Sequence, residues 1–390
     1  MSTIFKRLEE LYPEMVDIRR KLHAEPELSF HEVKTPAFIA NYLEDLGVEV
    51  KRGVGGRGVV GYIKGELPGK TVALRADFDA LPIHEDTGLD FSSNVPGVMH
   101  ACGHDGHTAT LLVCAKVLME HRDQLKGTIV LIHQFAEELA PGGAIEMIKD
   151  GCLEGVDVIY GTHLWNPLPL GEVGYRSGPI MAASDRFEVT IQGRGGHGAA
   201  PHETIDAVTV GSSVVQNLQH VVSRQVDPLK SAVVTTASFQ AGGPFNVIAD
   251  TAELIGTARS FEEDVQELVI DKMEQMIKGV CEGMGASYTF KYVKGYPAVV
   301  NDGFETERFA KVAKEIHSPE LVVETAPVMG GEDFAYYLKE VPGTFFFTGS
   351  GNPSVGADYP HHHPKFTFDE QAMLLAGKLL VQAAITYQDQ

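Results

Sequence analysis

The chain has 390 residues, 44% hydrophobic and 22% charged, as in an average globular protein and unlike a disordered or fibrous one. Its 53 acidic and 32 basic residues give a net charge of −21, which disfavours nucleic acid and anionic membrane surfaces as partners. No apolar run is long enough for a membrane span, no signal peptide is recognisable, and the four cysteines are too scattered for a disulfide framework. We therefore expect a soluble, cytoplasmic protein.

The first part of the chain alternates helices with apolar strands. Helical periodicity covers residues 5–22, 32–46, 109–119 and 144–149. Short apolar runs predict buried strands at 71–75, 127–133 and 156–160. Near-continuous apolar strands separated by helices are typical of a largely parallel sheet covered on both faces.

The middle of the chain has a different pattern. Apolar and polar residues alternate in the predicted strands 187–191, 233–239, 252–260 and 287–292, and helices are predicted at 204–222 and 265–280. This order indicates a small α+β domain whose sheet is open on one face. The first pattern returns with a helix at 304–316, a buried strand at 344–348 and a helix at 370–384. We place the boundaries of the three segments at 1–182, 183–292 and 293–390.

Residues that can bind metal follow the predicted strands. Cys102 and His104 share a glycine-bearing loop, Glu137 and Glu138 follow the strand at 127–133, and His163 follows the next strand. Thiolate, imidazole and carboxylate are the ligands of Zn²⁺ and its neighbours, and strand ends are where α/β sheets carry their sites. A row of histidines lies further along at His361, His362 and His363.

The adjacent carboxylates Glu137 and Glu138 could have different roles. If the chain is extended there, Glu137 and Glu138 point to opposite sides, so one can bind metal while the other carries a proton. The alternative is an ordinary solvated pair in a loop.

Two G-x-G-x-x-G runs, at 53–58 and 193–198, lack the helix that a dinucleotide site needs directly after the glycines, so we do not expect such a cofactor.

Together these residues resemble a known family over nearly the whole chain. The chain resembles the dinuclear-metal amidohydrolases and exopeptidases, and within them the branch of hippurate hydrolase, the plant indole-acetyl-amino-acid hydrolases and the N-acyl-amino-acid deacetylases. The motifs that carry the resemblance are Arg19 to His23, Pro26 to Phe30, Leu74 to Pro82, His100 to Asp105, Gln134 to Glu138, Gly195 to His197, Gly330 to Phe334 and His362 to Pro364.

The resemblance implies the following roles. Two divalent ions, Mn or Zn, would be held by Cys102, His104, Glu138, His163 and His362. Cys102 would bridge the two ions, Glu137 would be the general base, and Asp79 would orient a ligand histidine. His361 and His363 would be spectators. Residues that meet the substrate would be His197, reaching the site of a neighbouring subunit, together with Asn246, Arg259, Gly331 and Glu332.

The resemblance also implies that residues 183–292 are an inserted lid through which two chains form a homodimer. The positions of the five ligands support the insertion, because four precede the segment and one follows it. The implied reaction is hydrolysis of the amide of a small N-acyl amino acid. Two alternatives stay open: an exopeptidase acting on dipeptides, and a catalytically idle metal-binding scaffold on the same fold.

Overall fold

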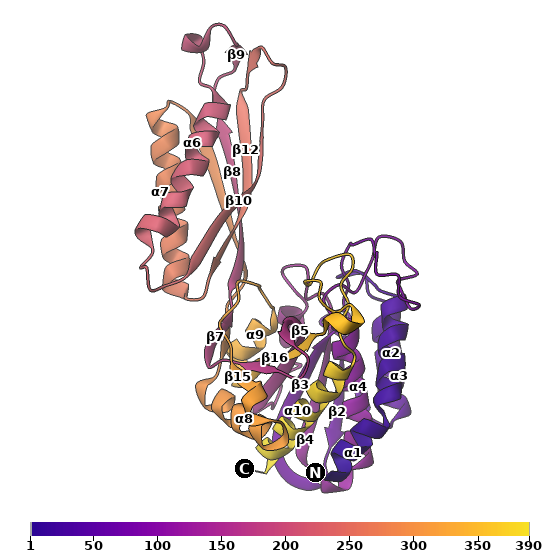
Figure 1. Ribbon diagram of the computed structural model, residues 1–390. Coiled ribbons are helices and arrows are strands. Elements are labelled where there is room, and N and C mark those ends of the chain that lie inside the picture. Colours follow the sequence, from indigo (N-terminus) through magenta and orange to yellow (C-terminus); the bar gives the residue numbers. More distant parts are fainter. Residues whose placement is uncertain (1, 390) are drawn as a thin grey trace. The chain divides into compact units, whose positions relative to one another are not determined.

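The computed structural model describes residues 2–389, which form two compact units. One unit contains the chain up to Ile180, Val299–Ala326 and the chain from Glu332 onward; the other contains Met181–Ala298 and Pro327–Gly331. We call them the sheet unit and the inserted unit (Figure 1). No helix among the described residues is long and apolar enough to cross a membrane.

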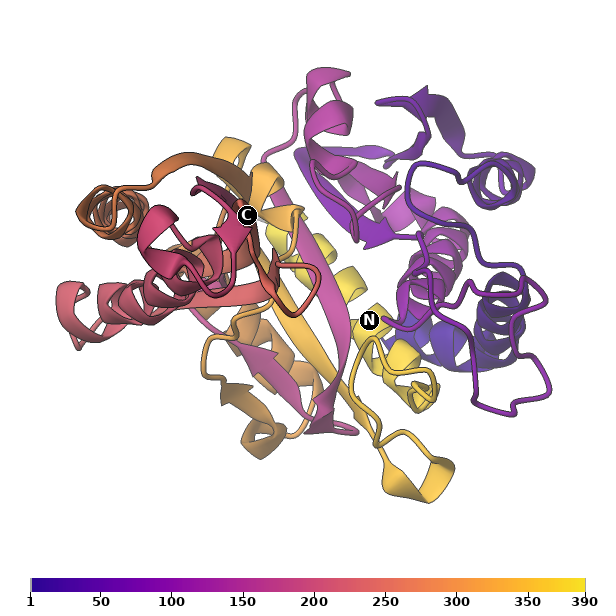
Figure 2. The ribbon, with the colours of Figure 1, turned by 90° about the horizontal axis from the view of Figure 1, so that it is seen from above.

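An eight-stranded mixed sheet forms the centre of the sheet unit. Its order is β1-β2-β4-β3-β5-β16-β6-β15, and its four central strands, β4, β3, β5 and β16, are parallel. Figure 2 shows β5 and β16 side by side. The strand bounds are β1 Glu49–Val54, β2 Gly58–Lys64, β3 Leu67–Asp77, β4 Lys126–Gln134, β5 Val158–Pro169, β6 Val173–Tyr175, β15 Val322–Glu324 and β16 Gly343–Gly351. The prediction of a largely parallel sheet is confirmed in its central strands.

Helices cover both faces of this sheet. Helices α4 and α10 pack on the central strands with α3 and α8 beside them, while α5 and α9 lie on the opposite face. The helix bounds are α1 Ser2–Glu10, α2 Tyr12–Ala24, α3 Lys34–Asp45, α4 His104–Glu120, α5 Ala144–Lys149, α8 Gly303–Ile316, α9 Phe334–Glu340 and α10 Gln371–Gln388. The helix predicted at 5–22 is two helices, because the chain turns at Leu11 and α2 begins again with Pro13 in its first turn.

The inserted unit is a four-stranded antiparallel sheet with two helices on one face. The sheet order is β10-β12-β8-β13, and the apolar residues of its strands pack against α6 and α7. The main elements are β8 Ala183–Gln192, α6 Ala207–His220, β10 Ala232–Ala241, β12 Thr251–Ser260, α7 Glu263–Gly283 and β13 Ser287–Tyr296. Alternating burial along β8 shows the one-sided sheet that the sequence pattern predicts.

Short elements complete both units. In the inserted unit, β9 Gly196–His197 pairs with β11 Val247–Ile248. Strands β7 Gly178–Met181 and β14 Val299–Asn301 pair with each other, and single turns of 3₁₀ or π helix lie at Arg122–Gln124, Pro201–Glu203, Val221–Gln225, Pro319–Leu321 and Pro353–Val355. Residues 327–331, which we placed in the last segment, pack with the inserted unit because Ala182 donates backbone hydrogen bonds to Val328 and Gly330.

Candidate metal centre and active site

The candidate site lies at the carboxyl ends of the central parallel strands. Asp77 ends β3, Glu137 and Glu138 follow β4, and His163 lies in β5. The loop with Cys102 leads into α4, which begins at His104 after Gly103 in a left-handed conformation (φ 99°). These segments are far apart in the sequence and meet because parallel strands end at the same edge of the sheet.

The structure brings all five predicted ligands into one connected group. Cys102 Sγ lies 3.4 Å from His163 Nε2. Cys102, His104 and Glu138 each offer a ligand atom within 4.8 Å of the other two. His362 Nε2 lies 3.3 Å from Glu138 Oε1, although the His362 side chain is 52% exposed.

In two histidines a hydrogen bond on Nδ1 turns the other ring nitrogen, Nε2, toward the ligand group. His104 Nδ1 donates to the backbone oxygen of Asp79, 3.0 Å away, and lies 3.2 Å from its carboxylate. His163 Nδ1 donates to the backbone oxygen of Leu164 at 2.8 Å. Because a carbonyl oxygen only accepts, both rings carry hydrogen on Nδ1 when neutral, and Nε2 is left to bind metal. Within residues 2–389, His104 Nε2 is buried and has no hydrogen-bond partner.

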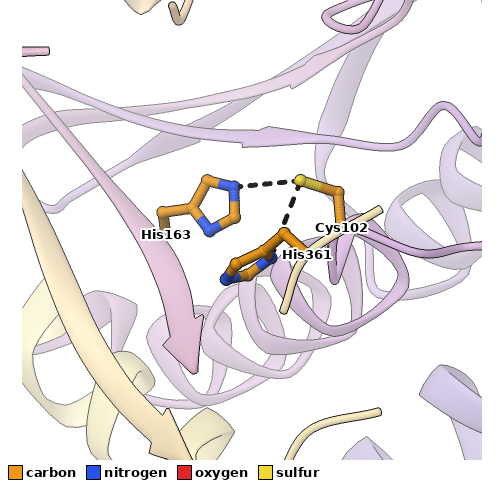
Figure 3. A group of neighbouring side chains, drawn as sticks. All are labelled: Cys102, His163 and His361. Carbon is orange, nitrogen blue, oxygen red and sulfur yellow. Dashed lines mark hydrogen bonds between the residues drawn. The ribbon is translucent and has the colours of Figure 1, made fainter. Parts of the chain in front are cut away.

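Two neighbouring histidines, His107 and His361, make hydrogen bonds with both of their ring nitrogens. His107 Nδ1 lies 2.6 Å from Asp77 Oδ1, and its Nε2 accepts from the backbone N–H of Leu164 at 2.9 Å. His361 Nε2 accepts from the backbone N–H of Asn166, which leaves Nδ1 to donate to Cys102 Sγ at 3.9 Å. In Figure 3 dashed lines join this sulfur to both His163 and His361. His361, which we expected to be a spectator, contacts the thiol, and one of its ring nitrogens lies within 4.8 Å of the ligand atoms of Cys102 and His163.

Electrostatics in the group favour a cation. Burial would lower the pKa of His104, but the carboxylates of Asp77 and Asp79 outweigh it and raise the pKa to about 10. Burial raises the pKa of the Cys102 thiol well above its usual value, and Glu138 and Glu137 raise it further. A positive ion among these groups would reverse both effects and stabilise a thiolate. The donor atoms present therefore fit a transition-metal centre.

Glu137 lies in a buried carboxylate cluster beside this group. Burial raises its pKa well above the usual value, and the charges of Glu332 and Glu138 add to the effect. A carboxylate that binds a proton readily is suited to accept and return one during a reaction. This cluster contains Glu137, Glu332 and Asp333, whose oxygens lie within 4.8 Å of one another.

Sequence reasoning missed the buried cation of this cluster. Arg75 on β3 is 2% exposed and donates to Asp77 at 2.6 Å, Glu332 at 2.9 Å and Asp333 at 3.0 Å. We expected Glu332 to contact substrate, but it is 1% exposed and its carboxylate binds Arg75 and the backbone N–H of Phe334. An arginine inside an otherwise apolar strand was the available signal, since such a charge needs buried partners.

The remaining predicted substrate residues form two pairs in the inserted unit. His197 and Asn246 are exposed neighbours, because His197 pairs with Val247 and Gly198 donates to the backbone oxygen of Asn246. Arg259 lies beside Gly331, where an added Cβ would come 3.4 Å from its guanidinium.

The two pairs lie at opposite ends of the unit's long strands. Arg259 on β12 pairs with Ser184 at the start of β8, whereas His197 follows the other end of β8, at Gln192. Ser184 and Gln192 are eight positions apart along the strand, a distance of about 26 Å at the usual rise per residue. One chain therefore does not bring His197 and Arg259 together.

Comparison with known proteins identifies the family. The profile of the family described as Peptidase family M20/M25/M40 matches residues 73–386. The chain belongs to this family. The resemblance read from the motifs is thereby confirmed.

Relatives of high identity cover most of the chain. YhaA of Bacillus subtilis, named as an amidohydrolase, is 58% identical over 98% of this chain and 97% of its own. Thermostable carboxypeptidase 1 of Saccharolobus solfataricus is 42% identical over 96% of this chain and 95% of its own. The N-acyl-L-amino acid amidohydrolase of Geobacillus stearothermophilus is 50% identical over 76% of this chain and 80% of its own.

A solved structure has the same fold. The YXEP protein of Bacillus subtilis, described as a dinuclear metal binding peptidase of the M20 family, superposes with a TM-score of 0.84. It is 36% identical, and the alignment covers 98% of this chain and 99% of that one.

Proposed function

We propose that this protein is a metal-dependent hydrolase that cleaves the amide of small N-acyl amino acids, giving a carboxylate and a free amino acid. One observation carries the proposal. The Nε2 atoms of His104 and His163 face the Cys102 sulfur, the Glu138 carboxylate lies within 4.8 Å of the His104 and Cys102 ligand atoms, and the buried carboxylate of Glu137 is next along the chain. Relatives named as amidohydrolases support the substrate class.

Five side chains would hold two divalent ions, Mn or Zn: Cys102, His104, Glu138, His163 and His362. The Cys102 sulfur lies 3.4 Å from His163 Nε2 and within 4.8 Å of the ligand atoms of His104 and Glu138, which supports the place between the two ions that the resemblance gives to it. Bound there, the ions would supply the Lewis-acid polarisation that amide hydrolysis needs. Asp79 would keep His104 in the required tautomer through its contacts with Nδ1.

Glu137 would move the proton in this reaction. Its carboxylate would take a proton from the attacking water and deliver it to the leaving amine nitrogen. The buried surroundings of Glu137 support this role, since they favour the protonated form that must donate in the second half of the reaction.

Substrate binding would use two copies of the chain. Arg259 and Gly331 would hold the carboxylate of the amino acid, and an arginine suits a bidentate grip. His197 would stabilise the developing negative charge on the carbonyl oxygen, with Asn246 beside it. The two ends of β8 next to these pairs lie about 26 Å apart, which exceeds the length of one N-acyl amino acid and favours the pairs' coming from different chains. We therefore infer a homodimer formed through the inserted unit, and, from the sequence alone, a cytoplasmic location.

A second candidate is an exopeptidase acting on dipeptides. The identity to a thermostable carboxypeptidase over nearly the whole chain favours it. Both reactions break an amide next to an amino acid carboxylate, so the same ions and Glu137 would serve either one.

The deciding experiment is an amine-release assay on matched panels of N-acetyl amino acids, N-benzoyl amino acids and dipeptides. We expect release from the N-acyl panel that stops with a chelator and returns with Mn²⁺ or Zn²⁺. Glu137→Gln is expected to lose turnover and keep its metal content, measured by elemental analysis. Faster release from dipeptides would favour the exopeptidase, and no release from any panel at full metal occupancy would favour the idle scaffold.

A further inference from the structure

The short segment 29–32, between α2 and α3, reaches the loop that carries Glu137. Glu32 is completely buried, and its Oε1 accepts a hydrogen bond of 3.0 Å from the backbone N–H of Ala136. The two residues are 104 positions apart in the sequence. The other carboxylate oxygen makes a long ion pair of 3.9 Å with Arg57 Nε. A buried carboxylate whose one short hydrogen bond reaches across the fold to a peptide group needs a reason, because its desolvation is costly.

The peptide that Glu32 holds is in an unusual conformation. Ala136 has φ +51°, in the left-handed region that residues with a side chain rarely adopt. Its N–H is held by Glu32, and its carbonyl oxygen accepts from the backbone N–H of Gly143 at 3.1 Å. This turn comes directly before Glu137 and sets the direction in which Glu137 and Glu138 leave β4.

A second hydrogen bond holds the chain on the other side of Glu137. The backbone N–H of Glu138 donates to Asp79 Oδ2 at 3.0 Å. The same oxygen accepts from the Ser29 hydroxyl at 2.7 Å, while the other oxygen of Asp79 faces His104. The hydrogen bonds that hold the backbone on both sides of Glu137 therefore depend on residues of the segment 29–32.

We propose that Glu32 and Ser29 are positioning residues for the general base. Glu32 keeps Ala136 in its left-handed turn, and Ser29 fixes the Asp79 carboxylate that binds the Glu138 N–H. Neither residue touches the ligand group, so each acts through the backbone on either side of Glu137. The inference rests on the proposed function, in which Glu137 moves the proton.

The test compares two replacements of Glu32 on the substrate that the panel hydrolyses fastest. Glu32→Met has a similar length and no acceptor, so Ala136 loses its partner and Glu137 is displaced. We expect kcat to fall about 10- to 100-fold with KM within about twofold, because small misplacements of a catalytic group have effects of this size. Glu32→Gln keeps an acceptor oxygen, and we expect it to restore kcat to within about threefold of the natural chain.

A matched control separates positioning from general stability. Glu305 on α8 is also buried, and its carboxylate accepts from the Tyr160 hydroxyl at 2.6 Å, away from the Glu137 loop. Glu305→Met is expected to lower thermal stability and leave kcat unchanged. Metal content is measured for every variant, and we expect that of Glu32→Met to equal that of the natural chain.

Several outcomes would overturn the inference: an unchanged kcat in Glu32→Met, an equal loss in the Gln and Met variants, or the same loss in Glu305→Met. If Glu32→Met does not fold, Ser29→Ala decides, with an expected kcat loss of about 3- to 10-fold and rescue by Ser29→Thr. Failure of the proposed function is recognised separately, because the natural chain would then release no amine from any panel, or Glu137→Gln would keep its turnover.

Discussion

Replacing Arg75 by methionine tests whether one guanidinium stabilises the buried carboxylates behind the candidate site. Arg75 donates to three carboxylates, those of Asp77, Glu332 and Asp333, and to the side-chain oxygen of Gln134 at 2.9 Å. Methionine fills most of the same volume, so the change removes charge and donors and creates little cavity.

The other contacts of these carboxylates limit the expected loss. Asp77 keeps the His107 ring at 2.6 Å, Glu332 keeps the Phe334 N–H, and Asp333 keeps the Gln134 amide. Each carboxylate therefore keeps one hydrogen-bond donor and loses the positive charge of Arg75. Removing one partner from a buried ion pair costs about 3–5 kcal/mol, so we expect a loss of about 4 kcal/mol in the free energy of unfolding.

The single tryptophan provides the assay. Trp165 lies in β5 of the sheet unit and stacks on Phe347, so its fluorescence reports unfolding of the unit that contains Arg75. With a slope of about 3 kcal/mol per molar urea, the loss moves the midpoint down by about 1.3 M. All samples contain chelator, so that a difference in metal binding does not contribute.

A surface arginine serves as the control. Arg7 pairs with Glu120 and Glu10 at the surface, where solvent screens the charges, so Arg7→Met should leave the urea midpoint almost unchanged. Equal midpoints for the Arg75 and Arg7 variants would refute the reasoning that burial makes the Arg75 cluster important.

Two further predictions concern pH and helix propensity. Burial opposes ionisation of Glu85, but hydrogen bonds, from His23 first, outweigh it and lower the pKa to about 2 from an ordinary 4.5. A carboxyl whose folded-state pKa is lowered stabilises the protein above its unfolded pKa and loses this effect as pH falls toward the folded value. Glu85→Gln should therefore cost about 1–2 kcal/mol at pH 7 in urea unfolding and progressively less below about pH 4.5; a difference independent of pH would contradict this. In α7, a Cβ added at Gly279 meets no atom within 4 Å, so Gly279→Ala should stabilise the inserted unit by about 0.5–1 kcal/mol in thermal unfolding followed by circular dichroism. Gly256→Ala is the contrasting variant, since its Cβ would lie 2.2 Å from a backbone oxygen of the neighbouring strand; a stabilised Gly256→Ala would show that the packing argument is wrong.

Local sequence pattern determined much of the fold. Apolar runs predicted the buried strands, and alternating apolar and polar residues predicted the open sheet of the inserted unit. Whether a strand is buried on both faces or on one can be read from the pattern of a few consecutive residues. The structure extends α4 back to His104, where the prediction began at 109. Polar residues fill that first turn and are buried by the site, which a periodicity argument does not detect.

The side chains that could bind metal were also readable from the sequence, since Cys102, His104, Glu138 and His163 lie at strand ends or in a loop beside them. Tertiary structure decided which histidines are free to bind. His107 stands three residues after His104, yet the Leu164 N–H occupies its Nε2. That hydrogen bond joins residues 57 apart in the chain, so no local pattern distinguishes the two rings.

The sequence by itself therefore determined the kinds of side chain at the site and the ends of the strands that present them. Only the tertiary structure decided their protonation, partners and direction. Arg75 meets Glu332 across 257 positions, and Glu32 meets Ala136 across 104. The physical reason is that propensity and periodicity act within a few residues, whereas buried charges and strained turns are stabilised by groups that folding brings from far along the chain.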